Sequence, residues 1–173
     1  GIVGGSTNGA ADAWSSSMFY LVAYVLTTLG TFGVMMLMSR NGHEADDIAD
    51  LKGLGRRSPA LAFVMLILMF SLAGIPPTIG FYAKLSVLKA VIDAGMIWLA
   101  VLAVLMSLVG AFYYLRIVKT VYFDEPVDTQ ALRPLPSAHA LLAVNGALVL
   151  LLGVVPGPLM SLCADAVKQA FGG

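Results

Sequence analysis

Lys84 is the residue whose type and position could do chemistry, because it lies in an apolar segment that two adjacent prolines interrupt. The segment "SLAGIPPTIGFYAKLSVLKAVI" covers 71–92, and Pro76 and Pro77 precede the lysine within it. A charged side chain at the bilayer centre costs roughly 2.5–3.5 kcal/mol on insertion scales, and such residues usually face water or protein. A titratable amine at such a position indicates a functional role for Lys84.

Lys84 and Lys89, the second lysine of the segment, differ in their predicted depth in the membrane. Nine residues separate Lys84 from Asp93, the predicted end of this span. At about 1.5 Å per residue this is roughly 13 Å, against about 15 Å for half the hydrocarbon core. Lys84 is therefore predicted near the midplane. Lys89 is about 6 Å from the same end and can reach the headgroups, so we interpret it as an anchor.

The prolines predict a break in the helix that carries Lys84. Pro76 and Pro77 remove two backbone donors, and the flanking Gly74 and Gly80 loosen the chain further. Two half-helices result, the first ending in free carbonyls and the second beginning with free N–H groups. Irregular backbone at this depth occurs where protein or water covers it. A simple proline kink is the alternative; two prolines beside a buried lysine favour a break that admits water.

Other polar residues of the apolar segments give weaker signals. Ser71, Thr78 and His139 form a possible polar path to the lysine. A histidine can relay protons, although an interfacial one is more often simply solvated. Thr27 and Ser107 are interpreted mainly as helix-packing residues, which could also hold water.

Composition places the chain in the membrane. It is 59% hydrophobic and 12% charged, with a mean hydropathy of +0.89, whereas soluble domains carry about 25% charged residues. The zero net charge gives no indication of nucleic-acid binding. No C-x-x-C, paired-histidine, G-x-G-x-x-G or P-loop motif occurs, so we expect no cofactor and no metal in this chain.

Span lengths predict an all-α integral membrane protein with four transmembrane helices, the second broken at Pro76–Pro77. Lys and Arg concentrate in loops 39–59 and 116–137, which are therefore predicted to be cytoplasmic, with the N-terminal segment and the C-terminal tail on the opposite side. The absence of an initiator methionine suggests a piece of a longer chain, with 1–173 as part of one polytopic domain. The expected spans are 18–38, 60–92, 96–115 and 138–155, followed by an interfacial tail over 159–171 that could instead continue the fourth span.

The motif around the lysine resembles a known family. The stretch "DLKGLGRRSPALAFVMLILMFSLAGIPPTIGFYAKLSVLKAVI" (50–92) is similar to the C-terminal part of subunit N of proton-pumping NADH-quinone oxidoreductases, the bacterial respiratory complex I. "FYLVAYVLTTLGTFGVMMLMSR" before it and "WLAVLAVLMSLVGAFYYLRIVKTVYFDEP" after it are also similar. The resemblance is weakest over the first fifteen residues and after Pro134.

This resemblance implies a fourteen-helix antiporter-like subunit, of which the chain would be the last four helices. Lys84 matches the lysine of the family's broken twelfth helix and would carry protons by alternating between charged and neutral forms. The subunit would be a non-redox part of the enzyme in the bacterial inner membrane, bound to lipid and other membrane-arm subunits. Flavin, iron–sulfur clusters and quinone would belong to partner subunits.

Two other functions stay open from the sequence. The related subunit M type has glutamate in place of Lys84, which argues against that type, but the D-type subunit of multi-subunit cation/proton antiporters has a similar G-[IL]-P-P and lysine pattern. A purely structural membrane module, whose lysine pairs locally, is the third possibility.

Overall fold

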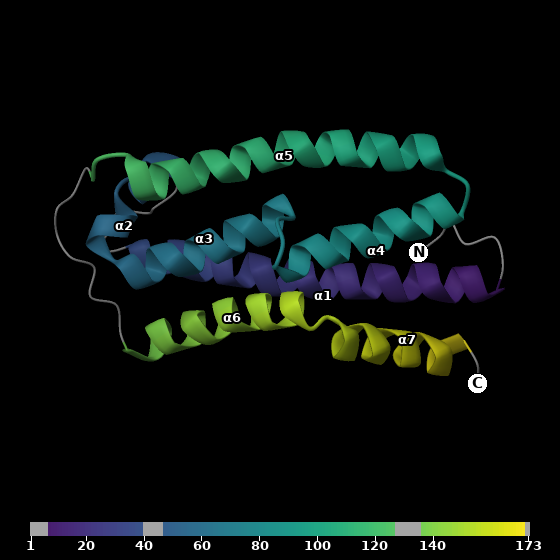
Figure 1. Ribbon diagram of the computed structural model, residues 1–173. Helices are drawn as coiled ribbons and strands as arrows, with labels where there is room; N and C mark the ends of the chain where they lie inside the picture. The colour runs from purple at the N-terminus through teal and green to yellow at the C-terminus, as the bar shows by residue number, and fades with distance from the viewer. Residues whose placement is uncertain (1–6, 40–46, 127–135, 172–173) are drawn as a thin grey trace.

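A computed structural model describes residues 7–39, 47–126 and 136–171, and every regular element in these ranges is helical (Figure 1). The all-helical class predicted from span lengths is therefore confirmed for this part of the chain. The elements are α1 (Thr7–Met38), the short 3-10 helix η1 (Ile48–Leu51), α2 (Leu54–Arg57), α3 (Pro59–Ala73), α4 (Ile79–Asp93), α5 (Ile97–Phe123), α6 (Pro136–Val154) and α7 (Gly157–Phe171).

The long helices run side by side along one axis. Figure 1 shows α3 and α4 end to end, α6 and α7 likewise, and α1 and α5 as single long helices. α1 contacts α3, α4, α6 and α7, and α5 contacts α3 and α4. Within the described ranges, three helices are long and apolar enough to cross a membrane: Ala11–Met38, Ile97–Phe123 and Pro136–Val154.

Two helices are longer than the hydropathy of the sequence predicted. α1 begins at Thr7 rather than Met18, and the hydroxyls of Ser15 and Ser17 donate to the carbonyls of Asp12 and Ala13 inside this added part. α5 continues beyond 115 to Phe123 through a basic and aromatic stretch. Backbone pairing prolongs a helix past the point where its side chains stop being apolar, and hydropathy does not detect this continuation.

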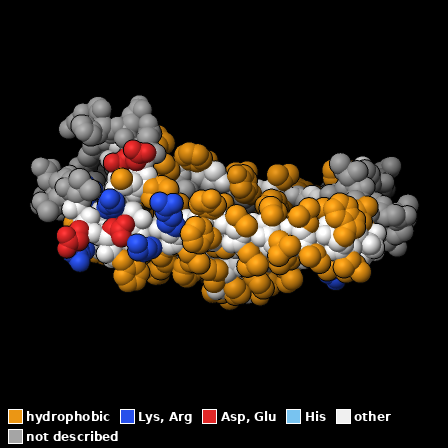
Figure 2. Space-filling view, turned by 90° about the horizontal axis from the view of Figure 1, so that it is seen from above, with side chains coloured by type: hydrophobic (Ala, Val, Ile, Leu, Met, Phe, Trp, Pro, Cys, Tyr) orange, Lys and Arg blue, Asp and Glu red, His pale blue; other side chains and the backbone are white. Residues whose placement is uncertain are grey.

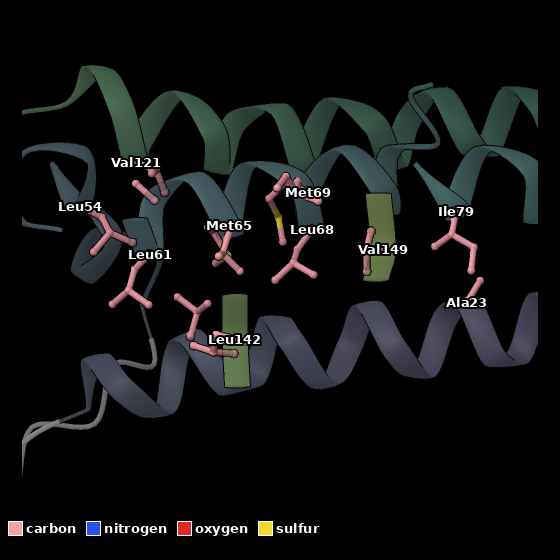
Figure 3. Close-up of a cluster of buried hydrophobic side chains, with 14 of the residues drawn as sticks. Ala23, Leu54, Leu61, Met65, Leu68, Met69, Ile79, Val121, Leu142 and Val149 are labelled. Atoms are coloured by element: carbon pink, nitrogen blue, oxygen red, sulfur yellow. The ribbon is translucent and has the colours of Figure 1, made fainter. Parts of the chain in front are cut away.

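α3 lies at the centre of the described bundle and α5 lies at its edge. Figure 3 shows the buried side chains between α3 and its neighbours, with Ile79 of α4 directed toward Ala23 of α1. In α5, by contrast, Trp98 is 69% and Phe112 66% exposed. In Figure 2 hydrophobic side chains extend along the visible face, while most of the visible charged ones gather at one end. The buried members of α3 are Leu61, Ala62, Val64, Met65, Ile67, Leu68, Met69, Ser71 and Ala73.

The C-terminal helix α7 continues the line of α6 along the bundle (Figure 1) and packs on α1, where Cys163 and Val167 are buried. α7 thus runs along the bundle and not across it. At the end of α6, Gly153 lies against the backbone of Pro77 and Ile79, so closely that a Cβ atom would overlap it. α6 therefore rests directly on the segment between α3 and α4.

Candidate functional site

Lys84 reaches from α4 to the end of α3 and to α5. Its Nζ donates to the carbonyl oxygens of Leu72 at 2.9 Å and Ala73 at 3.0 Å, and to the Oγ of Ser107 at 2.8 Å. An ammonium group has three N–H donors, so three acceptors satisfy all of them. The side chain is half-buried, and every one of these partners comes from another helix.

The prolines explain why two backbone carbonyls are free to bind the lysine. In an α-helix the carbonyl of residue i accepts from the N–H of residue i+4. The carbonyls of Leu72 and Ala73 would accept from residues 76 and 77, and Pro76 and Pro77 have no N–H to donate. The two acceptors that the prolines release are therefore the same two that Lys84 Nζ binds.

The end of α3 also favours a cation by its dipole. Unpaired carbonyls at a helix C-terminus carry partial negative charge, which stabilises a nearby positive side chain by about 0.3–1 kcal/mol at the surface and more when partly buried. Lys84 occupies this position on α3 although it belongs to α4. The end of α3 therefore provides a binding site for the ammonium group of Lys84.

Gly74 ends α3 beside the lysine. Its φ of +81° is left-handed, and its N–H donates to the carbonyls of Phe70 and Ser71. A Cβ at this position would lie 2.8 Å from Cδ of Lys84 and 3.1 Å from its Nζ. Glycine is thus required here both for the turn and for the approach of the lysine.

Ser71 links α3 to α4 and to α1 by hydrogen bonds. Its buried Oγ accepts from the backbone N–H of Gly80, in the first turn of α4, at 3.2 Å and shares a 3.1 Å hydrogen bond with Thr27 of α1. A Cβ on Gly80 would overlap the Ser71 carbonyl, so this close approach needs glycine. Ser71 makes no hydrogen bond with Lys84 in the described structure; its position favours a role in joining α1, α3 and α4.

A cavity of about 620 Å³ lies between α1, the α3–α4 pair and α5. Lys84 and Ser107 are on its wall, together with the hydroxyl-bearing Ser71 and Thr27. The phenol rings of Tyr20, Tyr24 and Tyr114 also line it. Most of the other lining residues are apolar, so these hydroxyl groups are the ones that can hold water beside the amino group of Lys84.

Thr78 and His139, two of the three residues suggested for a polar path, lie elsewhere. The hydroxyl of Thr78 donates to the Ile75 carbonyl at 2.7 Å within the turn between the half-helices. His139 lines a second cavity of about 510 Å³ between α3 and α6, where its Nε2 has no partner among the described residues. Of the three, the structure brings only Ser71 to the cavity of Lys84. The exposed Lys89 lines neither cavity.

Ser107 is the site residue that sequence reasoning undervalued. It is a single serine in an apolar helix, 23 residues beyond the lysine that it binds. The number of residues that separates Lys84 and Ser107 from the turn at Asp93 can be counted in the sequence, and it indicates that both lie at a similar depth. The rotation of α5 that points the hydroxyl at the lysine cannot be inferred in this way. Within the described ranges no group of three or more His, Cys, Asp or Glu side chains could hold a metal ion.

Comparison with known proteins agrees with the resemblance noted in the sequence. Residues 2–110 match the model of the family described as NADH:quinone oxidoreductase/Mrp antiporter, TM. NADH-quinone oxidoreductase subunit N of Cupriavidus taiwanensis is 59% identical over 99% of this chain and 35% of its own length. The subunit N of Nitrosomonas europaea is 58% identical over 92% of this chain and 33% of its own length. The chain therefore spans about a third of these relatives.

Two solved structures have the same fold. Respiratory complex I from Thermus thermophilus with bound aureothin matches with a TM-score of 0.77 and 34% identity, over 86% of this chain and 34% of the matched one. The Mrp complex from Dietzia matches with a TM-score of 0.74 and 21% identity, over 90% and 37%, and supports the fold alone. The family model covers more than half of the chain, and the apolar helices agree with a multi-pass membrane protein. The chain belongs to the NADH:quinone oxidoreductase/Mrp antiporter transmembrane family.

Proposed function

We propose that this chain belongs to a proton-translocating membrane subunit of an NADH-quinone oxidoreductase, and that Lys84 carries the proton. The observation that carries the proposal is the binding of Lys84 Nζ by Leu72 O, Ala73 O and Ser107 Oγ beside a cavity. The relatives named subunit N support the choice of enzyme. The chain itself would transfer no electrons and would act as a non-redox part of the translocase.

The membrane arrangement that we propose has four spans. α1, α5 and α6 each cross the bilayer, and α3 and α4 together make one span that is broken between Gly74 and Thr78. α7 would continue the last span outward beside α1. Loops 39–59 and 116–137 would be cytoplasmic, with the N-terminal segment and the tail on the opposite side of the bacterial inner membrane.

The mechanism follows from the partners of the lysine. In its charged form Lys84 is held by the negative end of α3 and by α5. In its neutral form the attraction to the helix end weakens, because a neutral amine gains less from these carbonyls than a charged one. A change of charge on a neighbouring buried group can then load or unload the proton. Water beside the break would connect the site to bulk solution.

Partners and cofactors lie outside this chain in the proposed assembly. Other membrane-arm subunits would contact the exposed apolar faces, of which that of α5 is the largest described here. Quinone reduction, with its flavin and iron–sulfur clusters, would take place in partner subunits and shift the charge state of Lys84 through buried ionisable groups. Lipid would cover the remaining apolar surface.

A cation/proton antiporter subunit is the second candidate, favoured by the fold shared with the Mrp complex. Purification of the full-length protein separates the two candidates. Recovery of NADH dehydrogenase subunits with it supports the oxidoreductase, whereas sodium-dependent proton exchange without them supports the antiporter.

The direct test of the proton carrier is Lys84→Ala in the full-length subunit within the assembled enzyme. We expect proton pumping in membrane vesicles to be lost, with assembly checked by NADH oxidation with an artificial electron acceptor. Wild-type pumping and quinone reduction in a normally assembled Lys84→Ala enzyme would show that Lys84 is not the carrier.

A further inference from the structure

Only one of the three partners of the Lys84 amino group can reverse its hydrogen bond. The carbonyl oxygens of Leu72 and Ala73, at 2.9 and 3.0 Å, accept hydrogen bonds and cannot donate them. Ser107 Oγ, at 2.8 Å, belongs to a hydroxyl group, which can both accept and donate. The three partners therefore respond differently to a change in the protonation of the lysine.

The numbers of donors and acceptors match both states of the lysine. A charged amine presents three N–H donors, and the two carbonyls and Ser107 accept them. A neutral amine presents two N–H donors and one lone pair, which suit the two carbonyls and one O–H donor. We infer that Ser107 is the proton-exchange partner of Lys84, its hydroxyl accepting from the charged lysine and donating to the neutral one. This inference rests on the proposed role of Lys84 as proton carrier.

The hydroxyl hydrogen of Ser107 is available for this exchange. Several other serine and threonine hydroxyls in these helices donate to a carbonyl of their own helix, as those of Ser86, Thr31 and Thr120 do. No backbone acceptor for the Ser107 hydroxyl occurs within the part of the chain that the structure describes. Ser107 also lines the cavity of about 620 Å³, into which its O–H can point while Oγ accepts from the lysine.

The transfer balances with one water molecule in the cavity as proton acceptor. One N–H bond of the Lys84 ammonium breaks and its proton joins Ser107 Oγ. In the same step the former hydroxyl proton passes to the water, so no charge stays on the serine and no electrons are exchanged. The new O–H bond already points at the lone pair of the neutral amine, which is the reversed hydrogen bond that the neutral state needs. The opposite sequence reloads the lysine.

The test compares Ser107→Thr with Ser107→Val in the full-length subunit of the assembled enzyme. The two side chains have nearly the same shape, and only threonine keeps a hydroxyl. Loss of one hydrogen bond predicts a pumping rate at least about fivefold lower for valine, with more than half of the rate kept by threonine. The ratio of pumping rates in H₂O and D₂O should also rise for valine, because proton transfer at Lys84 then limits the rate.

Ser86→Ala is the matched control, since among the described residues the Ser86 hydroxyl bonds only the Ala83 carbonyl of its own helix, at 2.9 Å; it should pump as wild type. Ser107→Ala replaces valine if the valine variant does not assemble, with the same expected loss. The inference is wrong if valine or alanine pumps as wild type, if threonine is as slow as valine, or if only hydroxyl-bearing variants assemble. If the Ser107→Val enzyme pumps as wild type while the Lys84→Ala enzyme does not pump, then Ser107 has no role in the proton transfer. Lys84 remains the proton carrier in that case.

Discussion

Replacing both prolines of the break by alanine should impair the lysine site without touching the lysine. Pro76→Ala together with Pro77→Ala gives residues 76 and 77 backbone N–H groups. These groups can bond to the carbonyls of Leu72 and Ala73, which Lys84 Nζ now occupies at 2.9 and 3.0 Å. In the variant, a backbone N–H group therefore competes with the ammonium group of Lys84 for each of the two carbonyls.

The size of the effect follows from the two hydrogen bonds at stake. A hydrogen bond to a charged group contributes roughly 1.5–3 kcal/mol, so losing both removes about 3–6 kcal/mol of interaction from the ammonium group. Each 1.4 kcal/mol is a factor of ten in an equilibrium constant. Gly74 still holds its left-handed turn and opposes closure of the helix, so only part of this loss is expected. Proton pumping should fall by at least about tenfold, and by less in each single variant.

The assay is proton uptake by membrane vesicles after NADH is added, followed with a pH-sensitive dye and divided by the amount of assembled enzyme. Pro158→Ala is the control, because Pro158 stands in the first turn of α7, where a backbone N–H would have no helical partner. That variant should pump as wild type. A normally assembled double variant at 76 and 77 that pumps at the wild-type rate would refute the link between the prolines and Lys84.

Two further predictions concern neighbouring positions. Gly80→Ala should lower the stability of the extracted enzyme by about 1–3 kcal/mol, because the new methyl group would overlap the Ser71 carbonyl; an unchanged melting temperature would contradict the close contact. Lys89→Ala should leave pumping within about twofold of wild type, because its side chain is exposed and lines neither cavity; a loss as large as that of Lys84→Ala would show that depth in the membrane does not separate the two lysines.

Much of the fold could be predicted because its signals are local. The apolar runs coincide with the long helices, and the adjacent prolines lie between the end of α3 and the start of α4. The early start of α1 at Thr7 was missed because Ser15 and Ser17 are polar by composition, yet their hydroxyls bond within the helix. Hydropathy measures the preference of a side chain for an apolar environment over water. The length of a helix also depends on whether the backbone hydrogen bonds continue.

The site could be predicted in part, for a different physical reason. The sequence alone shows that Pro76 and Pro77 leave two carbonyls unpaired, since helical pairing has a fixed offset of four residues. Which side chain binds those carbonyls depends on how α4 folds back beside the end of α3. The contribution of Ser107 depends in addition on the rotation of α5 about its axis, which several weak packing contacts decide together.

The contact at Gly153 limits how the segment between α3 and α4 can move. Because α6 has no side chain at this point, its backbone fills the space beside Pro77 and Ile79. A movement of Pro77 or Ile79 toward α6 would bring their backbone into overlap with Gly153, so α6 would have to withdraw first. Gly153 thus places the backbone of α6 directly against the segment between α3 and α4, and a movement of that segment toward α6 must include α6.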